Sequence, residues 1–518
     1  MTYPAELASK GRPYARQWLS TTVSLGLYAL AWFLLTAIYY KATQSIQINS
    51  DNASNVLEAG SILRGNVFLR GWFLPPDTFY SLDTQIDVLL LSLGFQPIVI
   101  SHLTPAMIYA FLVLTVTSIT QYYGQDRVSS LVSSALFVAC PIGFFQSLVL
   151  VSPIHILTII IAIILFWFLN RDAELQYSAA FGLTYIATLG DPYFTYLSTL
   201  PIVLVSLWRI SNRNSFSRDL RVLLSVLLGM VAAGLSVQLI GRFGGYRIAS
   251  TTVQFVRFSH LAHNFYLYAL GLLDVFQSHF FGQKPFAPET LLKVGHASVV
   301  VIAAYWGIRH FHVRAGKSAD FMTICLTSAA LISVAFIFSN MPVNRATGRY
   351  LSVMPVLLSL FFGIYYYRAV TPFLRYFAVA ISIFGTYSFS QSILTKHQVR
   401  YENQKAVLQF LTAHHLKYGF GGYWNSALFT LLSNQRVMVR QVSAPPHGRV
   451  EPFLWLANSR WYKKVPEAVF FIIGPTGNFG LSMKTVTMTC GRPTSADRVG
   501  EYRIMVFKND NTMGSQLC

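Results

Sequence analysis

Residues 19–40 are LSTTVSLGLYALAWFLLTAIYY, a run of 22 residues without a charged side chain. A helix that crosses a bilayer needs about 20 mainly apolar residues, so this run is long enough to span a membrane. It is also longer than the apolar core of a typical signal peptide, and no small-residue cleavage site follows it. The run therefore indicates a membrane anchor that is retained.

The rest of the chain has the same character. Of its 518 residues, 53% are hydrophobic and only 11% are charged, whereas an ordinary soluble domain carries about 25% charged residues. This composition excludes a soluble multidomain protein and a disordered chain, and four cysteines are too few for a disulfide scaffold. We therefore predict a mostly α-helical protein that crosses the membrane several times.

Apolar runs of suitable composition predict eleven spans. A mixed segment between Arg242 and Lys293 contains a further apolar patch, Phe265–Phe276, which would raise the number to twelve or thirteen. The predicted spans are Leu19–Tyr40, Leu103–Tyr122, Val128–Leu150, Ile154–Asn170, Tyr177–Leu189, Phe194–Trp208, Leu220–Ile240, Val294–Trp306, Phe321–Ser339, Tyr350–Tyr366 and Phe373–Ile393.

The basic residues predict the orientation of the chain. With the N-terminus inside, the inner segments hold fourteen Lys and Arg residues, whereas the short outer turns hold two, as the positive-inside rule requires. The net charge of +19 is scattered between the apolar runs and forms no basic stripe, which argues against a nucleic-acid partner. The acceptor sequence Asn52-Ala53-Ser54 for N-glycosylation lies beside a candidate base, which favours a bacterial plasma membrane.

Two parts of the chain differ in pattern. Residues 1–395 form the predicted membrane domain, with a large first outer loop at 41–102, and residues 396–518 lack long apolar runs. We expect this second part to be a small α/β domain on the outer face, where Cys490 and Cys518 are either a disulfide or free thiols. Its predicted helices are 402–414 and 424–433, and its predicted strands are 437–442, 468–473 and 502–508.

Acidic residues are scarce, and several fall on the outer side. A carboxylate at a membrane boundary loses hydration, so each is a functional candidate. Asp51 begins a stretch whose apolar residues have helical spacing, and it fits both an N-cap and a general base. Asp191 lies in the short outer turn 190–193, where it suits either a turn or a site. The first outer loop holds Asp51, Glu58, Asp77, Asp83 and Asp87.

The first outer loop resembles that of the C-type glycosyltransferases. The similar features are an acid that opens a short helix, then Gly65-Asn66-Val67 and Phe79-Tyr80-Ser81-Leu82-Asp83; a second similarity is Gly348-Arg349-Tyr350 at the start of a late span. Lipid A aminoarabinose transferases and protein O-mannosyltransferases are similar in this loop. The resemblance implies their fold, and transfer of a sugar from a polyprenyl-phosphate donor to an envelope glycan, glycolipid or protein.

The resemblance also implies roles for individual residues. Asp51 and Asp191 are the candidate catalytic acids, with Asp51 as the base, and an in-line attack would invert the anomeric centre. These relatives commonly have a second acid directly after the first, but this chain has Asn52 there. Asp77, Asp83 or Asp191 would then supply the missing carboxylate. Whether a divalent cation binds is left open. The candidate donor-phosphate ligands are Arg349, Arg345 and Arg242; a snorkelling role at a span end is the alternative for Arg349.

Other functions stay open at this point. An envelope polysaccharide polymerase or ligase is one alternative, although such enzymes usually rely on a late outer loop. A transporter or flippase for a lipid-linked sugar is another; it would favour ionisable residues within spans and paired repeats, which the sequence lacks. The histidines show no zinc-binding spacing. Aromatic residues at 418–424 and at Trp455 and Trp461 suit either sugar stacking or a domain core.

Overall fold

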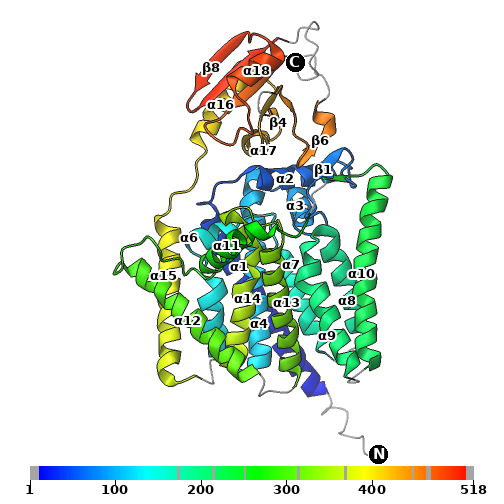
Figure 1. The fold of residues 1–518 in the computed structure, drawn as a ribbon, viewed down its shortest axis with the longest axis vertical. Helices are drawn as coiled ribbons and strands as arrows, with labels where there is room; N and C mark the ends of the chain where they lie inside the picture. Colours follow the sequence, from blue (N-terminus) through cyan, green and yellow to red (C-terminus); the bar gives the residue numbers. More distant parts are fainter. Residues whose placement is uncertain are drawn as a thin grey trace, which may run out of the picture.

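The computed structural model describes residues 11–171, 175–212, 216–249, 253–311, 316–366, 370–445, 448–462 and 468–508. Helices that run side by side form one layer, which we call the helical layer, and a sheet with short helices forms the C-terminal layer, residues 402–507 (Figure 1). The first loop, residues 41–102, lies between these two layers (Figure 1).

Every one of the eleven predicted spans falls on helical residues, in single or broken helices. The broken ones are interrupted by short π-helical or 3₁₀ segments. The elements of this layer are α1 (Gly11–Thr43), α4 (Pro97–Gly124), α5 (Arg127–Ser134), η1 (Ala135–Ala139), α6 (Gly143–Val149), α7 (Ile156–Leu169), α8 (Leu175–Gly190), η2 (Thr195–Thr199), α9 (Leu200–Ser211), α10 (Phe216–Arg242), η3 (Phe258–His260), α11 (Leu261–Val275), α12 (Pro288–Phe311), α13 (Lys317–Phe338), η4 (Arg345–Leu351), α14 (Val353–Phe361), η5 (Phe362–Tyr366) and α15 (Pro372–Thr395).

Fewer helices than eleven are long enough to cross a bilayer. Among the described residues six helical segments have the required length and apolar composition, and the pair α5–η1 and α6, which is bent by 87°, adds a seventh if it is one span. Helix α7 has 14 residues, short of the ~20 that a bilayer needs. The structure thus supports a membrane protein with six or seven candidate spans, and the number eleven stays a prediction.

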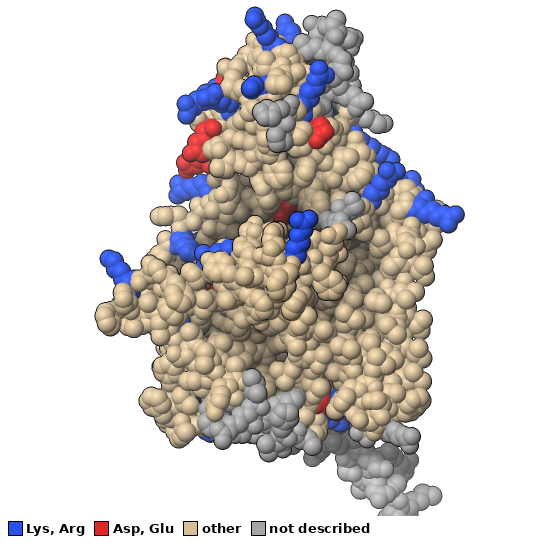
Figure 2. Space-filling model, in the orientation of Figure 1, with Lys and Arg blue, Asp and Glu red and all other residues tan. Residues whose placement is uncertain are grey.

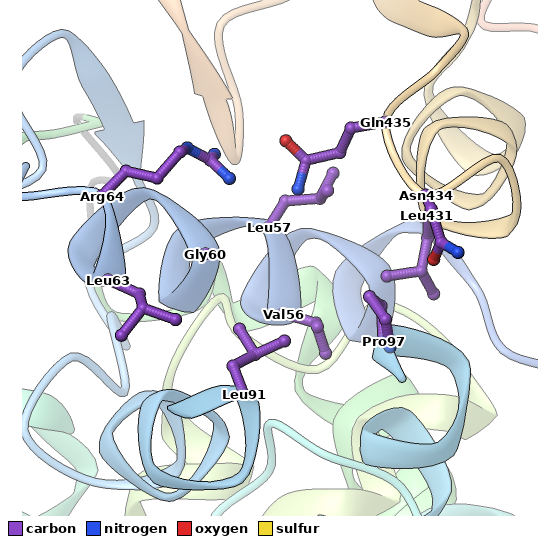
Figure 3. A pocket seen from close by; sticks show the side chains of 10 residues that line it. All are labelled: Val56, Leu57, Gly60, Leu63, Arg64, Leu91, Pro97, Leu431, Asn434 and Gln435. Atoms are coloured by element: carbon purple, nitrogen blue, oxygen red, sulfur yellow. The ribbon is translucent and has the colours of Figure 1, made fainter. Parts of the chain in front are cut away.

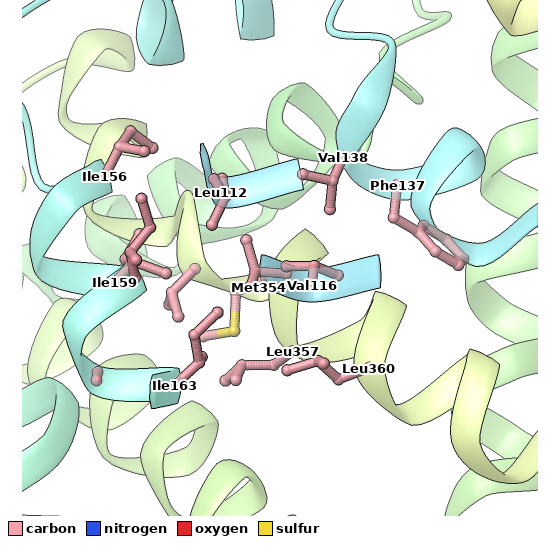
Figure 4. Packing of buried hydrophobic residues seen from close by; sticks show 14 of the residues in the cluster. Leu112, Val116, Phe137, Val138, Ile156, Ile159, Ile163, Met354, Leu357 and Leu360 are labelled. Carbon is pink, nitrogen blue, oxygen red and sulfur yellow. The ribbon is translucent and has the colours of Figure 1, made fainter. Parts of the chain in front are cut away.

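The side chains of this layer are arranged as a membrane protein requires. Its centre is a mainly apolar core to which α4, η1, α7 and α14 contribute, with Val116, Ile159 and Leu360 fully buried (Figure 4). In contrast, α1 and α10 expose long apolar faces that include Leu27, Phe33 and Leu228. Exposing such an apolar face to water is energetically unfavourable, whereas contact with lipid is not.

The C-terminal layer confirms the predicted α/β elements. Its six-stranded sheet has the order β5-β4-β3-β7-β9-β8, in which β4, β3 and β7 are parallel. The sequence did not reveal β3, β8 or α18; Cys490 ends α18, and Cys518 lies outside the described residues. The elements are α16 (Glu402–Ala413), β3 (Tyr418–Gly422), α17 (Tyr423–Leu432), β4 (Met438–Ser443), β5 (Glu451–Pro452), η6 (Ser459–Tyr462), β7 (Val469–Ile473), α18 (Met483–Cys490), β8 (Ser495–Val499) and β9 (Tyr502–Phe507).

The first loop joins the two layers. Its elements are α2 (Ser50–Leu63), β1 (Trp72–Leu74) and α3 (Asp83–Ser92). Strand β1 pairs with β2 (Arg247–Ile248) of the helical layer and with β6 (Ala457–Asn458) of the C-terminal layer. Helix α2 packs against α3 and α17, and ten of its fourteen residues are buried. These contacts therefore fix the position of α2 between the two layers.

Candidate functional site

The N-terminus of α2 is fixed by two asparagines. The side chain of Asn49 accepts a hydrogen bond from the backbone of Asn52, and the Asn52 side chain accepts one from the backbone of Asn49. Nδ2 of Asn52 also donates to the carbonyl of Ser152, at 2.6 Å. The predicted N-cap at Asp51 is therefore wrong, because Asn49 occupies that position. Asn52, which departs from the paired-acid pattern, is a capping and bridging residue.

Asp51 lies in the first turn of α2 and faces the C-terminal layer. The hydroxyl of Tyr423, the first residue of α17, donates a hydrogen bond to Oδ1 of Asp51. Ser50 donates from its Oγ to the backbone carbonyl of the same tyrosine. Burial raises the pKa of Asp51, and the Tyr423 hydrogen bond and the charge of Arg349 oppose that rise. A carboxylate with a raised pKa is a better proton acceptor than an ordinary aspartate.

Arg349 supplies a positive charge from the helical layer. Its charge lowers the pKa of both Asp51 and Asp77, so the three side chains share one electrostatic environment. Its Nε is buried and makes no hydrogen bond among the described residues. Element η4 holds it against α11, where a side chain at Gly271 would come within 2.9 Å of Leu351. The close approach of these two segments therefore needs a glycine.

Asp77 is brought to this site by close contact between two turns. The hydroxyl of Thr78 and the amide of Phe79 donate to the carbonyl of Gly190, at 3.3 and 2.7 Å. A Cβ at Gly190 would lie 2.7 Å from Oγ of Ser81, too close for any other residue. Burial raises the pKa of Asp77, whereas the charges of His155 and Arg349 lower it.

Asp191 is completely buried, and both of its carboxylate oxygens have hydrogen-bond partners. Its Oδ2 lies 2.7 Å from Nδ1 of His155 and accepts a hydrogen bond from Thr158 at 2.6 Å. Its Oδ1 accepts from the backbone of Tyr193, as a turn aspartate does. The hydroxyl of Tyr193 in turn donates to the carbonyl of Tyr350 at 2.7 Å. Asp191 therefore orients His155 and links its turn to the segment that carries Arg349.

The other acids of the first loop are buried, Glu58 on α2 and Asp83 and Asp87 on α3. Oδ2 of Asp87 accepts from Asn55 at 2.6 Å, and Oδ1 of Asp83 accepts from Ser152 at 2.7 Å. Burial raises the pKa of Asp83 to about 7 and that of Asp87 to about 8. Glu58 is 1% exposed, and neither of its carboxylate oxygens has a hydrogen-bond partner in the described part of the chain.

The predicted phosphate ligands other than Arg349 lie elsewhere. Arg345 makes a two-point ion pair with the buried Asp274, with distances of 2.7 and 2.6 Å. Arg242 ends α10 and is exposed. Of the three arginines, Arg349 alone has a charge that acts on Asp51 and Asp77 among the described interactions. The structure therefore brings Asp51, Asp77 and Arg349 together and leaves Arg345 and Arg242 apart.

The surface is hollowed between the two layers. An acidic side chain is visible inside this recess, and Lys or Arg side chains lie along its rim (Figure 2). At the other end of α2 a pocket of about 120 Å³ lies between α2, α3 and α17, with Arg64 and Gln435 facing each other above Val56, Leu63 and Leu91 (Figure 3). Asp51 does not line this pocket, and a rise of 1.5 Å per residue separates Asp51 from Arg64 by about 20 Å.

No group of three or more His, Cys, Asp or Glu residues is placed to hold a metal ion in the described part of the chain. Compared with protein-family models and with curated protein sequences, the chain matches none.

Sequence reasoning missed three contributors to the site, namely His155, Tyr193 and Tyr423. Tyr423 lies in the aromatic stretch 418–424 noted above, but it is 372 residues from Asp51 in the sequence. His155 has no sequence signal beyond its residue type, and its partner Asp191 lies 36 residues further along the chain. Only the tertiary structure places these side chains beside one another.

Proposed function

We propose that this protein is a membrane glycosyltransferase of the C type. It takes a sugar from a polyprenyl-phosphate donor and transfers it to an envelope glycan, glycolipid or protein. It acts on the outer face of a bacterial plasma membrane, to which the recess and the C-terminal layer are exposed. The observation that carries this proposal is the position of Asp51 between the two layers, where it accepts a hydrogen bond from Tyr423 of the C-terminal layer and is influenced by the charge of Arg349 of the helical layer.

The arrangement suits an in-line displacement. Asp51 takes the proton of an acceptor hydroxyl while the oxygen forms a bond to the anomeric carbon. The bond from that carbon to the lipid-phosphate oxygen breaks, and the phosphate leaves with the electron pair. Arg349, whose Nε is free of hydrogen bonds, stabilises that phosphate through its planar guanidinium. Such a displacement inverts the anomeric centre.

Asp191 and Asp77 have supporting places in this mechanism. Asp191 is buried and hydrogen-bonded, so it orients His155 and does not touch the substrate. The charge of Arg349 acts on Asp77 as well as on Asp51, so Asp77 adds to the negative potential around the guanidinium. These charges are in place before the donor arrives, which is how enzymes obtain most of their electrostatic stabilisation.

The test is sugar transfer by Asp51→Asn protein beside the wild type. Purified full-length protein is offered a set of polyprenyl-phosphate sugars with an envelope extract as the acceptor. We expect the folded variant to lose at least ~100-fold in rate, the low end of what a general base contributes. Thermal unfolding of both proteins provides the control for folding. Equal rates for the two proteins would exclude Asp51 as the base.

A transporter for a lipid-linked sugar is the second candidate. The observation in its favour is the 87° break between η1 and α6, since transporters often build their sites from discontinuous helices. Donor-dependent transfer of label to the extract by the wild type separates the two candidates. Movement of a labelled lipid-linked sugar across liposomes, with no transfer, would support the transporter.

A further inference from the structure

Four aromatic rings of the C-terminal layer gather above Asp51. The ring of Tyr423 lies 4.8 Å from that of Trp424, 5.4 Å from Phe453 and 5.5 Å from Phe479, measured between ring centroids. Phe453 and Phe479 are 5.1 Å apart. We call these four residues the aromatic wall; its member Tyr423 is the residue that donates a hydrogen bond to Asp51.

The aromatic wall has a buried member, Tyr423, and two exposed members, Trp424 and Phe479. None of its four residues belongs to the buried hydrophobic clusters formed by the described residues. Trp424 and Phe479 are each 41% exposed, although burial of a large aromatic side chain is strongly stabilising. Phe479 also has a φ of 50°, a left-handed conformation that is unfavourable for a bulky residue. Strained and exposed residues of this kind cluster at binding sites.

The hydroxyl of Tyr423 shows where an acceptor hydroxyl would sit. In the mechanism above, the acceptor must place its O–H against the carboxylate of Asp51. The phenol of Tyr423 makes that contact in the structure, so it occupies the acceptor position. An acceptor has to displace this hydroxyl and then lies beside the exposed rings of Trp424 and Phe479.

We propose that the aromatic wall is the acceptor subsite and that its ligand is a carbohydrate. The apolar C–H face of a sugar ring packs well on an aromatic ring, and the same sugar carries hydroxyls on its rim. One residue of a glycan can thus stack on Trp424 or Phe479 and present a hydroxyl to Asp51. The Ser or Thr of a protein acceptor has no flat face of this kind. This inference rests on the proposed function, and it narrows the acceptor to a glycan or a glycolipid sugar.

Tyr423 has a second role under this proposal, which is to keep water from Asp51 while the acceptor is absent. Water at that position would donate its proton to Asp51 and form a bond to the anomeric carbon, which releases free sugar and lipid phosphate. Tyr423→Phe removes the covering hydroxyl but keeps the ring. We expect this variant to hydrolyse the donor at least threefold faster than the wild type without extract; a merely structural role for Tyr423 would not accelerate hydrolysis.

The experiment measures transfer by full-length Trp424→Ala and Phe479→Ala proteins while the amount of envelope extract is varied. We expect the half-saturating amount of extract to rise about tenfold, which corresponds to 1.4 kcal/mol, while that of the donor stays within twofold. Phe410→Ala is the matched control, because Phe410 contacts His414 on α16 and belongs to no part of the wall. Protease digestion of the extract should leave transfer unchanged.

Failure of the inference is distinguishable from failure of the proposed function. If the wild type transfers no sugar from any donor, the proposed function falls and the acceptor subsite falls with it. If the wild type transfers sugar but both wall variants need the wild-type amount of extract, the wall is not the acceptor subsite. If protease digestion abolishes transfer, the acceptor is a protein and the carbohydrate assignment is overturned.

Discussion

The first loop contains two groups of carboxylic acids that differ in their partners. Asp51 and Asp77 lie within the influence of Arg349 and are partly accessible. Glu58 on α2 and Asp83 and Asp87 on α3 are buried, and their hydrogen bonds in the described structure come from neutral groups or are absent. The two groups thus differ in their electrostatic surroundings: the charge of Arg349 opposes the rise in the pKa of Asp51 and Asp77, whereas no cation opposes it among the described influences on Asp83 and Asp87.

Removing the cation is the sharpest test of this comparison and has the largest expected effect. Arg349→Gln should lower the rate of sugar transfer by roughly 10²–10³-fold, as for loss of one donor in an oxyanion hole. The phosphate leaving group loses its partner, and the carboxylates of Asp51 and Asp77 lose the charge that favours their ionised forms. Steady-state rates with saturating donor check this prediction.

Arg349→Lys provides the control for charge against geometry. Lysine keeps the charge but not the two-pronged donor, so we expect an intermediate rate. A rate for Arg349→Gln within twofold of the wild type would remove Arg349 from the mechanism and leave the two groups of acids chemically alike.

The sequence predicts contacts between residues that are close in the chain better than contacts between distant segments. The spacing of Ala53, Val56 and Leu57 predicts α2 because a helix buries residues three and four apart, and these three residues are buried. The cap was assigned to Asp51 instead of Asn49, because polar residues of both types suit that position. Backbone geometry decides between such neighbours, and the sequence does not contain it.

Contacts between distant segments could not be predicted at all. Tyr423 reaches Asp51 because α17 packs on α2, and the turn after Asp77 is joined to the Asp191 turn by hydrogen bonds from Thr78 and Phe79 to the carbonyl of Gly190. Neither residue type signals its partner. The number of spans stays a prediction for a related reason: composition identifies apolar helices, but α7 is short and the α5–α6 pair is bent, so an apolar helix is not always one complete straight span.

Arg345 tests whether pairing with an acid is sufficient to make a site. Its partner Asp274 is buried, whereas Arg345 itself is partly open to solvent. Arg345→Gln would leave a buried carboxylate without its cation, which costs 3–5 kcal/mol for a fully buried pair; we expect about 1–3 kcal/mol here because solvent screens the arginine. Chemical unfolding should show this loss, and the transfer rate of the folded protein should stay within about threefold. A rate loss as large as that of Arg349→Gln, without loss of stability, would make Arg345 a phosphate ligand as well.

Glu58 tests the buried group of acids. Burial raises its pKa well above the usual value, and the nearby Asp87 adds to this effect. Because the folded protein holds this proton more tightly than the unfolded chain, stability falls as the pH rises from about 4.5 through the raised pKa. Glu58→Gln removes the titration and loses no hydrogen bond.

We therefore expect Glu58→Gln to gain about 1 kcal/mol of stability at pH 8, since one pKa unit is worth about 1.4 kcal/mol. The gain should shrink at pH 5, where Glu58 is protonated in the folded wild type. Thermal unfolding at the two pH values measures both. A destabilised variant at pH 8 would show that Glu58 is ionised and paired, and would bring it into the same class as Asp51.

Arg242 has the smallest expected effect and completes the comparison, because it is a cation without an acid. It lies exposed at the end of α10, where surface substitutions usually change stability by less than 0.5 kcal/mol. Its charge does not act on Asp51 or Asp77 in the described interactions, so Arg242→Ala should keep the transfer rate within twofold at ordinary salt. Measurement at low and high ionic strength gives the discriminating result. A rate loss confined to low salt would mean that Arg242 attracts the anionic donor from a distance, whereas a loss at both salt concentrations would place it in contact with the phosphate.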